Sequence, residues 1–288
     1  MEGIVVKGIG GFYYVKVEDQ IIQCKGRGIF KKDGIKIAVG DLVTIELNEG
    51  SDATITKIHE RRNCFIRPPI ANVDCFAVVM AAANPEPNLA IIDRFLVMAE
   101  KSNMDVILCV NKIDLAEPDM VERLEKIYKK IYPMVFLNAK TGSGIDDLKQ
   151  LMAGKKCALA GPSGVGKSTI LNALEPKVTV ETGEISEKTK RGKHTTRHVE
   201  IFDTNFGALV FDTPGFTSFE VLEAEEDELQ HLYPEMLPYL GKCKYDDCRH
   251  MKEPECCVLE AVQSGEISKS RYRSYTEQYK EIKEKKKY

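Results

Sequence analysis

The sequence has 288 residues, a formal net charge of −3 and a hydrophobic fraction of 43%. This length exceeds one ordinary small core and predicts two or three domains. No apolar run approaches the roughly 20 residues that cross a bilayer, and the N-terminus shows no cleavable signal pattern. We therefore expect a soluble protein with no membrane partner and a cytoplasmic location.

The first 66 residues predict short β-strands separated by glycine-containing turns. The expected strands are 3–8, 12–17, 21–25, 41–47 and 53–58, and five such strands favour a small barrel of the oligonucleotide-binding (OB) type. Basic residues are interspersed with aromatic ones on this segment and directly after it: Lys25, Arg27, Lys31, Lys32 and Lys36 near Phe30, and Arg61, Arg62 and Arg67 near Phe65. This pattern suits RNA binding, although many small barrels carry part of it.

Residues 70–216 alternate between predicted strands and helices. The strands are 73–82, 105–110, 133–137, 155–160, 199–202 and 208–211, and the helices are 89–101, 120–131, 145–152 and 167–174. Such alternation predicts a mostly parallel sheet covered on both faces. From residue 219 the pattern is helical, apart from a segment rich in Cys and His.

A phosphate-binding loop follows the apolar strand at 155–160. Its residues match the pattern G-x-x-x-x-G-K-[ST]: Gly161, Pro162, Ser163, Gly164, Val165, Gly166, Lys167, Ser168 and Thr169. Glycines let successive backbone N–H groups surround phosphates, and the following helix adds its N-terminal dipole. Lys167 is expected to reach the β- and γ-phosphates, and Ser168 is expected to ligate Mg²⁺.

Four residues that follow another apolar strand indicate which base the nucleotide carries: Asn111, Lys112, Ile113 and Asp114. They resemble the guanine-reading N-K-x-D motif, in which the carboxylate accepts from N1–H and the exocyclic amine of guanine. A site built for those two donors rejects adenine. Asn138, Ala139 and Lys140 follow the next strand and resemble the base-backing S-A-K motif, with Asn138 in place of serine.

Two further segments are typical of nucleotide switches. Asp212, Thr213, Pro214 and Gly215 resemble D-x-x-G, in which Asp212 acts on Mg²⁺ through water and the Gly215 N–H senses the γ-phosphate. A polar segment that includes His194, Thr195 and Thr196 suits a switch loop. Either Thr195 or Thr196 is expected to complete the Mg²⁺ shell. His194 is either catalytic or an ordinary solvated loop histidine.

The order of these motifs is circularly permuted, because N-K-x-D and its backing motif precede the phosphate loop. The same sheet forms if the usual ends are joined and the chain is cut elsewhere, since termini often lie close together. Phe216 occupies the position where many GTPases carry a water-orienting glutamine. We therefore expect slow hydrolysis by the protein alone, with catalysis completed by a partner or by a residue such as His194.

A cluster of metal-binding residue types lies near the C-terminus. Cys243, Cys248, His250 and Cys256 offer three thiolates and one imidazole, which suits a closed structural Zn²⁺ site. Cys257 competes with Cys256 for the fourth ligand position, and redox chemistry or coincidence are the alternatives to zinc. The basic tail after Ser268 suits either nucleic acid or a solvated charged helix.

Together these motifs resemble the ribosome small-subunit-dependent GTPase A family of bacteria along essentially the whole chain. The resemblance favours Cys256 as zinc ligand, because the family reads E-P-x-C where this chain has Glu253, Pro254, Glu255 and Cys256. It implies a multidomain α/β fold: an OB-type barrel (1–67), a circularly permuted P-loop GTPase domain (68–218) and a helical zinc-binding domain with a basic tail (219–288).

The resemblance also implies a late assembly factor of the small ribosomal subunit. Such a factor binds ribosomal RNA, carries GTP or GDP with Mg²⁺ and one Zn²⁺, works as a monomer, and hydrolyses GTP when the subunit stimulates it. Hydrolysis then drives release. The alternative is an RNA-binding checkpoint module for which GTP is a conformational ligand and hydrolysis is incidental.

Overall fold

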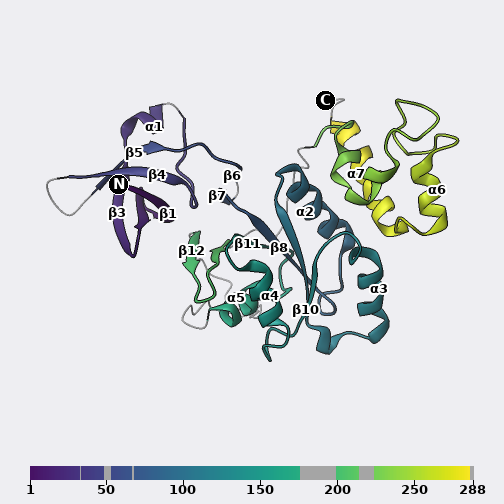
Figure 1. Cartoon of the computed structure of the whole chain (residues 1–288), viewed down its shortest axis with the longest axis horizontal. Coiled ribbons are helices and arrows are strands. Elements are labelled where there is room, and N and C mark those ends of the chain that lie inside the picture. The colour runs from purple at the N-terminus through teal and green to yellow at the C-terminus, as the bar shows by residue number, and fades with distance from the viewer. Residues whose placement is uncertain (33, 49–52, 67, 176–198, 214–223, 286–288) are drawn as a thin grey trace, which may run out of the picture. The chain divides into compact units, whose positions relative to one another are not determined.

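The computed structural model describes residues 1–32, 34–48, 53–66, 68–175, 199–213 and 224–285. Figure 1 shows its helices and strands, which belong to two compact units. The first contains Met1–Ala77, Ala139–Ala160 and Lys167–Thr217, and the second contains Val78–Asn138, Gly161–Gly166 and Ser218–Tyr288. Each unit is therefore assembled from segments that are distant in sequence.

The N-terminal strands of the first unit form a closed barrel. They are β1 (Glu2–Ile9), β2 (Phe12–Val17), β3 (Gln20–Gly26), β4 (Leu42–Leu47) and β5 (Ala53–Ile58), with the short helix α1 (Gly28–Lys32) after β3. The strand order is β1-β2-β3-β5-β4, and β4 pairs back onto β1. Alternate residues point into the barrel, and Val5, Val15, Val43 and Ile55 are fully buried there. Five strands at the predicted places thus close around one core.

Two features near the barrel were not predicted. A hairpin of β6 (Cys64–Ile66) and β7 (Pro69–Ala71) follows it. Arg61 binds the buried carboxylate of Asp41 at 2.6 and 2.8 Å and also donates to the Lys36 carbonyl. The guanidinium of Arg61 is therefore engaged in contacts within the protein, where sequence analysis had expected it on an RNA-binding surface. Arg67 lies outside the described residues.

The first unit also contains strands and helices of the nucleotide domain. These are β11 (Lys156–Ala160), β12 (Glu200–Asp203), β13 (Leu209–Asp212), α4 (Ile145–Met152) and α5 (Lys167–Leu174). β11 and β13 are parallel, as predicted, but β12 is antiparallel to β13. β12 also pairs with β1 of the barrel at Glu200 and Lys7, whose side chains form an ion pair of 2.6 Å. One sheet therefore runs from the nucleotide domain into the barrel.

The second unit carries the other half of the nucleotide domain. Its strands are ordered β10-β9-β8, with β8 (Cys75–Ala81) shared between the units, β9 (Asp105–Asn111) and β10 (Met134–Leu137). The helices are α2 (Leu89–Lys101), the 3₁₀ turn η1 (Ile113–Leu115) and α3 (Pro118–Tyr128). Every residue of β8 is buried. This explains its continuous apolar sequence, since a strand covered on both faces has no polar side.

The C-terminal part of the second unit is helical. It contains η2 (Leu229–Leu232), η3 (Pro234–Tyr239), α6 (Cys257–Ser264) and α7 (Lys269–Lys285). The segment considered a basic tail is mostly the ordered helix α7, and its Arg271 and Tyr275 are fully buried. None of the helices in the described residues combines the length and apolarity that a bilayer crossing requires.

Candidate nucleotide and metal sites

Backbone geometry explains the glycines of the phosphate loop. Gly161 has φ +142°, and a Cβ there would lie 2.2 Å from the carbonyl oxygen of Val79. Gly166 has φ +99°, and its Cβ would lie 2.4 Å from Nδ2 of Asn111. Any larger residue would collide at both places, so the loop requires glycine at its first and last glycine positions. Lys167 then begins α5.

The N-K-x-D segment is fastened to this loop within the second unit. Asn111 is 3% exposed, and its Nδ2 donates to the carbonyl of Val165 at 2.9 Å. Lys112 Nζ donates to the carbonyl of Gly164 at 2.8 Å and also to the carbonyl of Asn84. Two segments predicted to hold opposite ends of one nucleotide are therefore joined by side-chain hydrogen bonds. Asp114 lies in η1 and is exposed.

The predicted base-backing segment leaves the sheet beside N-K-x-D. Leu137, the last residue of β10, lies opposite Asn111, the last residue of the parallel strand β9. Asn138 follows directly. Because carboxyl ends of parallel strands meet at one edge of a sheet, this edge is where an α/β fold binds its ligand.

Lys167 is the ionisable group of the phosphate loop. Burial lowers its pKa to about 8, because desolvation disfavours the charged ammonium. A bound phosphate would restore the charged form. Ser168 and Thr169 follow it in the first turn of α5 and are half-buried.

The D-x-x-G segment begins where β13 ends. Asp212 is the last residue of that strand, and Thr213 Oγ1 donates to the carbonyl of Leu159 in β11 at 3.1 Å. This bond ties the start of the motif to the strand that leads into the phosphate loop. Gly215, His194, Thr195 and Thr196 lie outside the described residues, so their predicted roles stay predictions.

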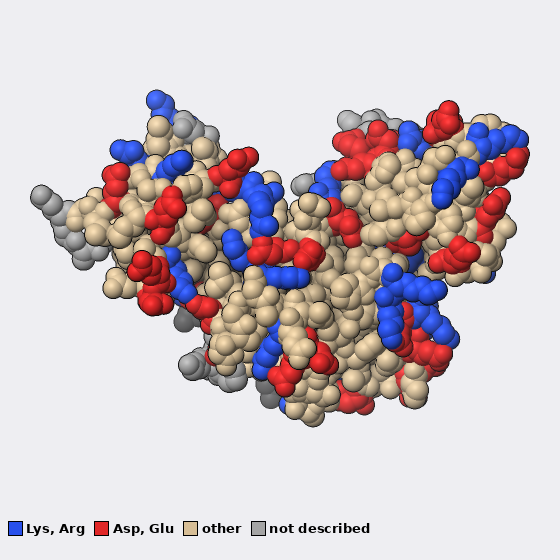
Figure 2. All heavy atoms as spheres, in the orientation of Figure 1, with Lys and Arg blue, Asp and Glu red and all other residues tan. Residues whose placement is uncertain are grey.

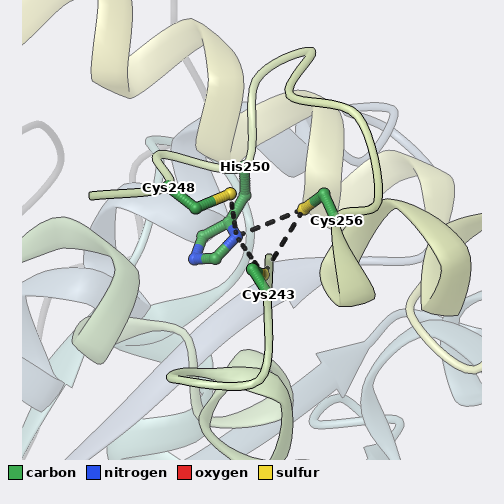
Figure 3. Close-up of side chains that lie close together, drawn as sticks. All are labelled: Cys243, Cys248, His250 and Cys256. Carbon is green, nitrogen blue, oxygen red and sulfur yellow. Dashed lines mark hydrogen bonds between the residues drawn. The ribbon is translucent and has the colours of Figure 1, made fainter. Parts of the chain in front are cut away.

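The four predicted metal ligands converge in the C-terminal region (Figure 3). Nδ1 of His250 lies 3.6, 3.4 and 3.3 Å from the Sγ atoms of Cys243, Cys248 and Cys256, and all four ligand atoms lie within 4.8 Å of one another. Three sulfurs around one imidazole nitrogen match the donor set of a tetrahedral structural zinc site. His250 also has φ +59°, a left-handed conformation that a non-glycine residue keeps only when its surroundings fix it.

Cys257 is not part of this group. It begins α6, and its thiol donates to the carbonyl of Lys242 at 3.0 Å. Burial raises the pKa of Cys248, because desolvation disfavours the thiolate. The geometry is therefore consistent with a zinc site whose fourth ligand is Cys256 and not Cys257.

Comparison with known proteins identifies the family. The family model described as RsgA GTPase matches residues 58–222, and the RsgA N-terminal domain matches residues 2–55. The chain belongs to the RsgA GTPase family. Membership of this family implies hydrolysis of GTP and binding of GTP or GDP together with Mg²⁺.

Relatives of this family match along the whole chain. The small ribosomal subunit biogenesis GTPase RsgA of Clostridium perfringens (strain SM101) is 46% identical over 283 residues, which is 98% of each chain. The protein of the same name from Caldanaerobacter subterraneus is 42% identical over 288 residues, covering 100% of this chain and 97% of the relative.

Two solved structures share the fold. The crystal structure of YjeQ from Thermotoga maritima has a TM-score of 0.84 and 38% identity, with 98% of both chains covered. YloQ, described as a circularly permuted GTPase, has a TM-score of 0.81 and 37% identity, with 99% and 95% covered. The permuted GTPase fold predicted from motif order is thus confirmed for this member of the RsgA family.

Several residues around the Cys₃His cluster fix its loop through contacts that sequence analysis did not predict. Both carboxylate oxygens of Glu253 accept backbone N–H groups of the same loop, at 3.0 Å from Arg249 and 2.6 Å from Met251. Tyr272 and Tyr275 of α7 donate their hydroxyls to the carbonyls of His250 and Arg249 at 2.7 and 2.8 Å. Helix α7 is therefore hydrogen-bonded to the loop that carries the Cys₃His cluster. Of these three residues, only Glu253 belongs to a recognisable sequence pattern, E-P-x-C; Tyr272 and Tyr275 belong to none.

Replacing Asp114 with asparagine is expected to change the preferred base. Guanine offers two donors to a carboxylate, whereas xanthine offers one donor and one carbonyl oxygen, which an amide matches. We expect GTP affinity to fall about 100-fold, which corresponds to about 3 kcal/mol, and xanthosine triphosphate affinity to rise. Competition against fluorescent GDP measures both. Asp119→Asn, on the exposed surface of α3, is the control, and unchanged GTP preference in Asp114→Asn would remove Asp114 from base reading.

Proposed function

We propose that this chain is a GTPase that acts late in assembly of the small ribosomal subunit. The observation that carries the proposal is similarity to small ribosomal subunit biogenesis GTPases over 98% of both chains, in a molecule whose N-K-x-D and phosphate-loop segments are hydrogen-bonded to each other. The cytoplasm is the expected location and a monomer the expected form. The three domains are proposed to span residues 1–67, 68–218 and 219–288.

In this proposal the nucleotide lies between the phosphate loop and the guanine-reading segments. Gly161–Gly166 and Lys167 hold the phosphates, and Asn111, Asp114 and Asn138 hold the base. Ser168, Asp212 and one of Thr195 and Thr196 hold Mg²⁺, while Gly215 senses the γ-phosphate. This assignment is supported by the contacts of Asn111 and Lys112 and by the burial of Lys167.

Zinc is proposed as the ion of the Cys₃His cluster, where it has a structural role. Four protein ligands leave no open position for a substrate, so the metal would stiffen the loop of residues 243–256.

The RNA contact is proposed to involve the barrel. Lys25, Arg27, Lys32 and Lys36 are exposed there, and Lys25 Nζ lies 5.0 Å from the ring centroid of Phe12. In the view of Figure 2, basic and acidic side chains are interspersed on this part of the molecule. Such a surface binds phosphates at selected points rather than along one continuous strip.

Stimulation by the subunit follows from the chemistry of residue 216. A phenyl ring cannot orient a water molecule, so a partner or another residue such as His194 completes the catalytic arrangement, and we assign that step to the subunit. Hydrolysis would then be confined to subunit-bound protein, and conversion of GTP to GDP would release it.

Co-sedimentation with purified small subunits tests this proposal. With a non-hydrolysable GTP analogue the protein should stay bound, and with GTP it should return to the supernatant after hydrolysis. Large subunits are the control. Equal retention with GTP and with the analogue would instead support the checkpoint module, and no binding to small subunits would contradict the ribosomal role.

A further inference from the structure

The second ring nitrogen of His250 has a specific partner. Nδ1 faces the three cysteine sulfurs, while Nε2 lies 2.9 Å from Oε1 of Gln230. A neutral imidazole that offers the Nδ1 lone pair to a metal must carry its proton on Nε2. That proton then points at an amide oxygen, which only accepts. The contact therefore matches the single tautomer that coordinates a metal through Nδ1.

Gln230 is itself held in position. Its Nε2 donates to the carbonyl of Asp227 at 3.3 Å, so its amide oxygen is the end left to face the imidazole. Its neighbours Leu229 and Leu232 in η2 are buried in the cluster that also contains Cys248 and Cys256. These neighbours pack on the same core as the metal ligands, while the hydrogen bond to Asp227 orients the amide of Gln230.

We propose that Gln230 is a positioning residue for the metal cluster, which fixes the tautomer and ring orientation of His250 and thereby sets the affinity for zinc. This inference rests on the proposed zinc site and adds a residue outside the four ligands. Partners of the distal nitrogen of metal-bound histidines typically change metal affinity 10- to 100-fold when they are removed. Gln230 lies on η2, outside the 243–256 loop, so the loop alone does not determine the affinity.

The test compares zinc affinity in three variants of the full chain, by competition with a chromogenic chelator. Gln230→Leu keeps a similar volume and removes the acceptor, so we expect zinc to bind about 10- to 100-fold more weakly. Gln230→Glu restores an acceptor of similar reach and should bind zinc at least as tightly as the wild type. Gln263→Leu, at an exposed glutamine of α6, is the matched control and should behave as wild type.

Cobalt substitution separates loss of the acceptor from loss of the local fold, because a site that no longer folds would lose its tetrahedral spectrum as well as its affinity. In Gln230→Leu, the ligand-field spectrum should keep the intensity of a tetrahedral site while the cobalt affinity falls. Equal zinc affinity in Gln230→Leu and wild type would overturn the proposal. Equal weakening in the Leu and Glu variants would also overturn it, because the site then needs the shape of glutamine rather than an acceptor. Wild-type protein without stoichiometric zinc would overturn the metal assignment itself.

Discussion

Replacing Arg271 with alanine is expected to destabilise the second unit by about 3–5 kcal/mol. Arg271 is 0% exposed, and its guanidinium donates to Asp93 of α2 at 2.7 Å and to Glu235 of η3 at 2.7 and 3.1 Å. The Cζ atom of Arg271 lies 4.5 Å from the ring centroid of Tyr233. Burial opposes the charge, but the two carboxylates raise the pKa of Arg271 well above its ordinary value, so it is charged at every relevant pH.

The cost arises because alanine leaves two carboxylates buried without a counter-charge. Asp93 keeps one partner, the hydroxyl of Tyr128, which donates at 2.9 Å. We expect the thermal midpoint to fall by about 10 °C, measured by calorimetry of the full chain. Arg273→Ala on the same helix is the control. Its side chain is 79% exposed and pairs with Glu277, so its loss should leave the thermal midpoint unchanged within the error of the measurement.

The triple variant Arg271→Met, Asp93→Asn, Glu235→Gln separates charge from packing. Removing all three charges together should recover most of the loss, since an apolar or neutral replacement of a buried ion group is often tolerated. If the triple variant is as unstable as Arg271→Ala, packing of the guanidinium rather than its charge is responsible. A shift below 2 °C in Arg271→Ala would contradict the ion-pair account altogether.

Replacing Lys167 with alanine is expected to weaken GTP and GDP binding about 100-fold. The ammonium is the predicted positive charge at the β- and γ-phosphates, and a charged hydrogen bond of this kind contributes about 3 kcal/mol or about 100-fold in affinity. Fluorescent GDP titration measures the loss, and Lys126→Ala on the exposed face of α3 is the control. Equal GDP affinity in Lys167→Ala and wild type would place the phosphates elsewhere.

The pH dependence of binding follows from the same residue. In nucleotide-free protein, burial lowers the pKa of Lys167 to about 8, while bound phosphate favours the charged form. Above pH 8 the lysine is neutral before binding, so binding must take up a proton and becomes weaker. We expect GDP affinity to be level below pH 8 and to fall by up to about tenfold per pH unit above it. A GDP affinity that stays constant from pH 7 to 9 would show that Lys167 gains no charge on binding.

Several elements of the fold were predictable because their signals are local. Helices α2, α4 and α5 have the predicted bounds. The start of α2 is marked by Asn88, whose side chain accepts the N–H of Ile91, and the glycines before α5 mark its beginning. Motif order gave the circular permutation for the same reason, since each motif is a contiguous group of residues.

Other features depend on residues far apart in the sequence, and no local pattern shows them. Arg271 and Asp93 are 178 residues apart, so a residue of an apparent basic tail was not recognised as the centre of a buried ion cluster. The pairing of β1 with β12 joins the barrel to the nucleotide domain through Lys7 and Glu200, which are 193 residues apart. Gln230 was missed because one glutamine in a short 3₁₀ turn has no metal-ligand pattern.

The most direct test of the central claim is GTP hydrolysis by the purified full chain, with and without small ribosomal subunits at fixed salt. The account predicts slow turnover by the protein alone, strong stimulation by small subunits and none by large subunits. Rapid turnover without any partner would contradict the argument from Phe216. GTP binding without stimulation by small subunits would leave the GTPase in place and contradict its ribosomal role.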